Sequence, residues 1–299
     1  MINRVTHQTI QRTALSNLQR NLTSMADLQG KLSSGKNLQR PSDDPSAVGR
    51  AMAMRADKAA AVQARRNADD GVAWLAQIDT ALQSSISALR RARDLTVQGA
   101  STGAMGQTPR NAIATELDGI RDTLLDLANT NVNGRLVFAG TSSDAVAFEG
   151  HDAATPYSWN GTADAPVNRR LGPDATVRVD ADGSTAFGVG AASVFQLIDD
   201  IAADLRAGNE VSNRLGELDA RMDAMLSTLA DVGIRYKQVT DAQQTLELTV
   251  QNFTSSISGI EDIDLAETVM ELQMQEVAYQ GALGATARVL QPTLMDFLR

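Results

Sequence analysis

The chain has 299 residues, of which 43% are hydrophobic, 4% are aromatic and none is cysteine, and its net charge is −9. An acidic surface repels the phosphates of nucleic acids, and the absence of cysteine excludes disulfides, thiolate catalysis and cysteine-ligated zinc. The sequence has neither the ~20-residue apolar run of a membrane-spanning helix nor a cleavable secretory signal. This composition favours long helices with narrow aliphatic seams.

The first predicted element is an amphipathic helix over residues 1–32. Its apolar residues recur every three or four positions, as one face of a helix requires; they are Leu15, Leu18, Leu22, Met25, Leu28 and Leu32. The opposite face is polar, with arginine but no acidic residue before Asp27. An organellar transit peptide has a similar composition, but the pattern runs directly into the next motif, which favours a helix of the folded protein.

A proline-bracketed turn follows in the stretch LSSGKNLQRPSDDPSAVGRAM, residues 32–52. Gly35 is a natural end for the first helix. Asp44 is well placed to cap the next helix, with Pro45 at its first position. Asp43 and Asp44 could instead bind a cation, but capping and turn formation explain them with fewer assumptions. The residues that define this turn are Ser33, Ser34, Gly35, Pro41, Ser42, Asp43, Asp44 and Pro45.

Two more helices are predicted before the chain changes character. One runs from about residue 45 to residue 98, and the other opens near Pro109 with Thr108 as its cap. The apolar seam of the second helix is Ile113, Leu117, Ile120, Leu124 and Leu127. A short strand is then predicted over residues 134–140, between two glycines.

Helical periodicity disappears between residues 141 and 189, which indicates a small β-rich insertion. Asn160 and Gly161 predict a hairpin turn. Asp180 and Asp182 resemble the start of a calcium loop, but no bidentate glutamate follows at the required spacing, so a hairpin turn is favoured. Because the ends of the insertion must lie close together for the helices to continue, we expect the insertion to be separable from them.

The longest periodic segment spans residues 215–260. Its apolar residues alternate strictly at spacings of three and four, a repeat typical of helices that supercoil around a partner. At about 1.5 Å per residue this helix would be roughly 70 Å long, so we expect an elongated molecule in which other helices cover the whole seam. The seam residues are Leu215, Leu218, Met222, Met225, Leu229, Val232, Tyr236, Val239, Gln243, Leu246, Val250, Phe253, Ile257 and Ile260.

A final helix is predicted after Glu261, Asp262 and Asp264, which we expect to cap a helix junction rather than to bind a metal. Pro292 disturbs its end. Its apolar face and that of the first helix have no predicted intramolecular partner of matching length, so we expect both to be assembly surfaces. The candidate interface residues are Leu15, Leu18, Leu22, Met25, Leu32, Leu272, Tyr279, Leu283 and Leu290.

The predicted fold is mainly α: an elongated antiparallel helical bundle or coiled coil formed by both chain ends, with a small β-rich inserted domain. We divide the chain into terminal helices at 1–40 and 262–299, a helical rod at 41–140 and 190–261, and the insertion at 141–189. The sequence has no phosphate-binding loop, nucleophile elbow or metalloprotease motif. We therefore expect no catalytic, cofactor-binding or metal site; an enzyme sited in the insertion is an alternative.

Several stretches resemble the flagellin-like proteins of the bacterial flagellum. The form of residues 41–45 is closer to the hook–filament junction members of this family than to flagellin itself. Pro292 departs from the family pattern, and Arg299 is more flagellin-like. The similar stretches cover both helical arms but not the insertion; they are residues 32–52, 133–141, 232–235, 260–267, 279–280 and 294–298.

The resemblance implies a structural adaptor of the flagellum. Such a protein binds a cytoplasmic export chaperone, is exported by the flagellar type III apparatus through an uncleaved signal, and forms a ring-like layer of its own copies between hook-associated protein 1 and the flagellin filament. Its terminal helices become an inner coiled-coil tube on assembly. A minor flagellin that polymerises within the filament is the alternative, and a coiled-coil sensor is disfavoured because the sequence has no membrane segment.

Overall fold

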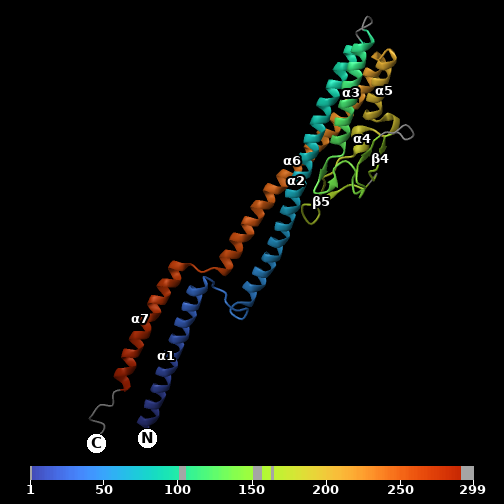
Figure 1. Ribbon diagram of the computed structural model, residues 1–299. Helices are drawn as coiled ribbons and strands as arrows, with labels where there is room; N and C mark the ends of the chain where they lie inside the picture. Colours follow the sequence, from blue (N-terminus) through green and yellow to red (C-terminus); the bar gives the residue numbers. More distant parts are fainter. Residues whose placement is uncertain (1, 101–105, 151–156, 163–164, 291–299) are drawn as a thin grey trace. The chain divides into compact units, whose positions relative to one another are not determined.

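The computed structural model describes residues 2–100, 106–150, 157–162 and 165–290, without the side chains of residues 2–8, 10–11 and 288–290. The chain divides into two compact units, unit 1 with residues 1–59 and 249–299, and unit 2 with residues 60–248. Two long helices, α2 (Pro45–Ala100) and α6 (Leu215–Glu261), are drawn in Figure 1. Each of them contributes residues to both units. The predictions for Pro292 and for residues 294–299 fall outside the described residues.

Unit 1 is built from helices. It holds α1 (Ile2–Ser34), the first part of α2, the last part of α6 and α7 (Leu265–Leu290). α1 ends as predicted at Gly35, which takes a left-handed φ of 69° and donates its N–H to the Lys31 carbonyl at 2.8 Å. Glycine adopts this conformation at low cost, so it ends helices efficiently.

Unit 2 contains α3 (Gln107–Ala128) and α5 (Val194–Ala207), which pack against each other beside parts of α2 and α6. The Ser193 hydroxyl caps α5 by accepting the Gln196 N–H, and Gly208 ends it in the left-handed region. Thr108 does not cap α3 as predicted, because the helix starts one residue before it and follows Gly106. Two short 3₁₀ helices precede α5 and α6, at Gly190–Ala192 and Ser212–Arg214.

Short strands lie within the insertion and just before it, and in the described residues they pair as three two-stranded antiparallel ladders. The tight turn Asn133–Gly134 joins the first pair, and both of its residues take positive φ. Of the strand predicted over residues 134–140, only two residues form a strand. The pairs are β1 (Asn131–Val132) with β2 (Arg135–Leu136), β3 (Phe148–Glu149) with β4 (Ser158–Trp159), and β5 (Asn168–Arg170) with β6 (Thr176–Arg178).

Two predicted turns in the insertion are wrong. Asn160 and Gly161 do not join paired strands, because β3 and β4 are connected through residues 150–157; the Asn160 N–H instead donates to the Ala147 carbonyl. Asp182 does not form a hairpin turn, since its carboxylate caps a short helix, α4 (Gly183–Phe187), by accepting the Ser184 N–H at 2.9 Å. A five-residue helix carries too little periodicity to be predicted from sequence.

One apolar core runs through unit 2 and joins the insertion to the helices. Phe148 of β3 contacts Phe187 of α4 and Phe195 of α5 edge to face, with ring centroids 5.7 and 5.2 Å apart. The Tyr157 hydroxyl donates to Asp199 of α5 at 2.7 Å, and burial raises the pKa of this tyrosine. The insertion is present as predicted, and its separability from the helices stays a prediction, which this shared core disfavours.

Asp180 is a second link between the insertion and the helices. Its side chain is fully buried and accepts the Val167 N–H at 2.8 Å and two hydrogen bonds from Arg178. Its backbone carbonyl accepts a hydrogen bond from Arg235 of α6 at 3.0 Å. A buried carboxylate is stable only when it is paired and hydrogen-bonded in this way.

The predicted seam of α6 is real but unevenly covered. Its fully buried residues are seven apart, the spacing of one heptad position, and they are Leu218, Met225, Val232 and Val239. Tyr236 is exposed and Val250 is only half-buried, so the expectation that every seam position is packed is wrong. Gln243, the polar residue of the seam, donates to Asp69 of α2 at 2.7 Å.

Candidate assembly interface

The terminal helices α1 and α7 lie side by side and antiparallel within unit 1 (Figure 1). The side-chain amide of Gln275 donates to the Asn21 carbonyl across the pair at 3.4 Å. The predicted interface residues that are half-buried in this unit are Leu18, Met25, Leu32, Leu272 and Tyr279. The prediction that the two helices lack an intramolecular partner of matching length is therefore wrong, because each covers one face of the other.

The remaining predicted interface residues are not covered. Leu15, Leu22 and Leu283 are exposed, and Leu290 lies at the end of α7, where its side chain falls outside the described residues. Large exposed apolar side chains on neighbouring helices are typical of a surface that another protein covers. The role of these residues in assembly stays a prediction.

α7 has a second apolar face, which was not predicted from the sequence. Met270, Met274 and Val277 are 58%, 65% and 70% exposed, and they lie about half a turn around the helix from Leu272 and Tyr279. With neighbouring residues they line a shallow hollow of about 740 Å³. Their spacing of four and three residues could have predicted this face from the sequence. The face that contains Leu272 has an equally regular spacing and was chosen instead. We call Met270, Met274 and Val277 the methionine face.

The proline-bracketed turn uses both of its carboxylates for backbone capping. Asp44 accepts the N–H groups of Ser46 and Ala47, each at 2.9 Å, and the bond from Ala47 lowers the pKa of the Asp44 carboxyl. Asp43 accepts the N–H groups of Gln39 and Arg40 at 3.1 and 2.8 Å. The predicted cap is confirmed, and it accounts for this acidic pair without a cation.

The α1–α2 and α6–α7 junctions are far apart in the sequence, but they meet at the exit of α1 in an antiparallel bridge between Lys36 and Asp262. The Asn37 N–H donates to the Glu261 carbonyl at 2.7 Å, and the Ile263 N–H donates to the Gly35 carbonyl at 3.2 Å. The end of α1 and the junction between α6 and α7 are thereby tied backbone to backbone.

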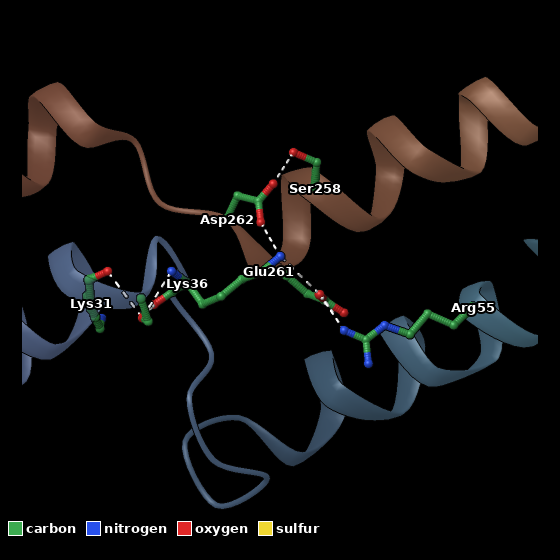
Figure 2. A network of polar contacts seen from close by, with 7 residues as sticks. Lys31, Lys36, Arg55, Ser258, Glu261 and Asp262 are labelled. Carbon is green, nitrogen blue, oxygen red and sulfur yellow. Dashed lines mark hydrogen bonds and ion pairs between the residues drawn. The ribbon is translucent and has the colours of Figure 1, made fainter.

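Ion pairs surround this bridge (Figure 2). The ammonium group of Lys36 contacts Asp262 and, at 3.5 Å, Glu261, and Arg55 of α2 donates to Glu261 at 2.6 Å. The hydrogen bond between Lys36 and Asp262 raises the pKa of the lysine; this bond and one from Ser258 lower the pKa of Asp262. We call these five residues, together with the backbone bridge, the Lys36 clamp.

The acidic junction at residues 261–264 is a capped helix junction, as predicted. The Asp264 carboxylate caps α7 by accepting the N–H groups of Ala266 and Glu267 at 2.9 and 3.2 Å. In the part of the chain that the structure describes, no group of three or more histidine or acidic side chains is arranged to hold a metal ion. Within the same ranges, no helix combines the length and apolar character needed to cross a bilayer.

Comparison with known proteins finds one family at both ends of the chain. The model of the bacterial flagellin N-terminal helical region matches residues 5–143, and that of the C-terminal helical region matches residues 215–298. The chain is similar to the flagellin of Bacillus subtilis strain 168, with 26% identity covering 96% of each chain. It is also similar to the flagellar hook-associated protein 3 of Escherichia coli K12, with 25% identity covering 85% of this chain and 87% of that one.

A solved structure shares the fold. The crystal structure of flagellar hook-associated protein 3 from Legionella pneumophila superposes with a TM-score of 0.62 at 13% identity, covering 70% of this chain and 98% of that one. The mainly helical architecture with a small inserted domain of short antiparallel strands is therefore confirmed.

Proposed function

Because the chain belongs to the flagellin family, we propose that it is the structural subunit of the bacterial flagellum that joins the hook to the filament. The observation that carries this proposal is the α1–α7 pair, in which each helix covers one face of the other and leaves further apolar side chains exposed. A monomer gains nothing from such faces in water, whereas a layer of copies buries them. The similarity to hook-associated protein 3 supports the junction as the place of this layer.

The partners follow from this role. A ring-like layer of copies of this chain would contact hook-associated protein 1 on one side and flagellin on the other. A flagellar export chaperone would bind the C-terminal helix before export, since the methionine face needs a cover in the cytoplasm. The protein would thus be secreted to the extracellular flagellum. This role is structural and requires neither catalysis nor a cofactor.

A minor flagellin is the second candidate, and one observation favours it. The similarity to the Bacillus subtilis flagellin extends over 96% of both chains, which is more than the similarity to the Escherichia coli junction protein covers. Such a subunit would polymerise within the filament instead of nucleating it.

Deletion of the gene separates the two candidates. If the chain is the junction subunit, the deletion strain should build hooks but no filaments and should release flagellin into the medium. The full-length gene should restore filaments, whereas a gene lacking residues 262–299 should not, even where that protein is detected outside the cell. Filaments of normal length and number on deletion cells would refute the junction role and favour the minor flagellin.

A further inference from the structure

A small pocket lies in unit 1 where the proline-bracketed turn folds over the start of α2. Its volume is about 210 Å³, which suits one or two side chains rather than a free ligand. Leu38 of the turn and Val48 and Met52 of α2 give it apolar walls. Met52 is 64% exposed, so a side chain from another molecule can reach the pocket.

The rim of this pocket is cationic. Lys36, Arg40 and Arg55 line it, and Glu261 is the acidic residue among the lining side chains. Glu261 is buried beneath Lys36 and Arg55, which remain 45% and 60% exposed. A pocket with apolar walls and a positive rim selects an apolar side chain that is flanked by carboxylates.

The methionine face of α7 has this chemistry. Met270 and Met274 are one turn apart, and Glu267 and Glu271 line the same hollow, each exposed. Methionine side chains are flexible and fill irregular gaps, so one of them can enter a pocket that a branched side chain would not fit.

We propose that the methionine face of one copy docks into this pocket of a second copy, with Glu267 and Glu271 against the cationic rim. The two surfaces differ, so the contact is heterologous: each copy offers both, and repetition gives a ring or a helical layer instead of a closed dimer. This contact rests on the proposed function, for which it supplies the copy-to-copy interaction.

Engineered cysteines test the contact, because the native chain has none. A strain lacking the native gene would carry two variants, Met52→Cys and Met274→Cys, and its isolated flagella would be oxidised and analysed for disulfide-linked dimers. The mixture should give dimers, and neither variant alone should. Ala53→Cys with Met274→Cys is the matched control, since Ala53 points about 100° away around α2; it should give few.

Charge reversal adds a readout of specificity. Arg40→Glu on the Met52→Cys copy, or Glu271→Arg on the Met274→Cys copy, should lower the dimer yield about threefold, and the two together should restore it. No dimer from the mixture in flagella that contain both variants would overturn the contact, as would dimers from Leu15→Cys with Met274→Cys instead. Dimers can be scored in isolated flagella whether the chain forms the junction or part of the filament. The contact can therefore fail while the junction role stands, and the junction role can fail while the contact stands.

Discussion

The uneven burial of the α6 seam makes a sharp prediction about two valines. Val232 and Val250 both belong to the seam, and their sequence environments predict the same cost for truncation to alanine. Val232 is fully buried in the core of unit 2, whereas Val250 is half-buried in unit 1. Truncation removes two carbon atoms, worth about 1.6 kcal/mol of transfer free energy at a buried site. The cavity left behind brings the expected cost of Val232→Ala to about 2.5 kcal/mol.

Tryptophan fluorescence measures this cost selectively, because both tryptophans, Trp74 and Trp159, lie in unit 2. With a urea m-value of about 3 kcal/mol per M, Val232→Ala should lower the midpoint of the fluorescence transition by about 0.8 M. Val250→Ala should leave this midpoint unchanged within about 0.2 M, since it removes partly hydrated carbon atoms in the other unit. Equal shifts for the two variants would show that the seam is packed evenly.

Three further outcomes are expected. The pKa of Asp262 is lowered from its ordinary 3.8 and that of Lys36 is raised from 10.5, so the contribution of this ion pair to the clamp should be complete between these two values. It should be lost as the pH falls through the lowered carboxyl pKa and lost again as the pH rises through the raised lysine pKa. Hydrogen-exchange protection of the Ile263 amide measures this, and protection that is constant down to pH 2 would contradict it. Asp180→Asn should destabilise unit 2 by about 2 kcal/mol, because it weakens the hydrogen bonds with Arg178 at a buried site; an unchanged fluorescence transition would be the contrary result. Limited proteolysis of dilute protein should cut α1 and α7 before α3 and α5, because the terminal pair leaves large apolar side chains exposed; equal resistance would show that the terminal pair is fully ordered in the monomer.

The long helices were predictable because each repeats its apolar pattern over many turns. The helix predicted from about residue 45 to residue 98 is α2, and the seam at residues 215–260 is α6 with one residue added. The caps at Asp44 and Asp264 were predictable for a different reason, since a capping carboxylate binds backbone groups two or three residues away. Contacts of this local kind can be read directly from sequence.

Features that depend on distant partners were not predictable. Lys36 and Asp262 are far apart in the chain, and nothing near either residue indicates that they pair. The strand β3 finds its partner across a connection of eight residues, while the more obvious turn at Asn160 and Gly161 joins nothing. The difference between Val232 and Val250 depends on which helices cover α6 along its length, and a heptad pattern shows only that a face is apolar.

The Lys36 clamp also has a mechanical consequence. It fixes the end of α1 to the start of α7 at the same level of an antiparallel pair, while the apolar contact holds the two helices together along their lengths. A force that tilts one helix is therefore transmitted to the other through the bridge, so the two helices should tilt together about this point. Strain arriving at the terminal helices would reach α6 through the backbone of residues 262–264, and the ion pair between Arg55 and Glu261 would pass part of it to α2. Weakening this one ion pair should loosen the link to α2 without unfolding the α1–α7 pair.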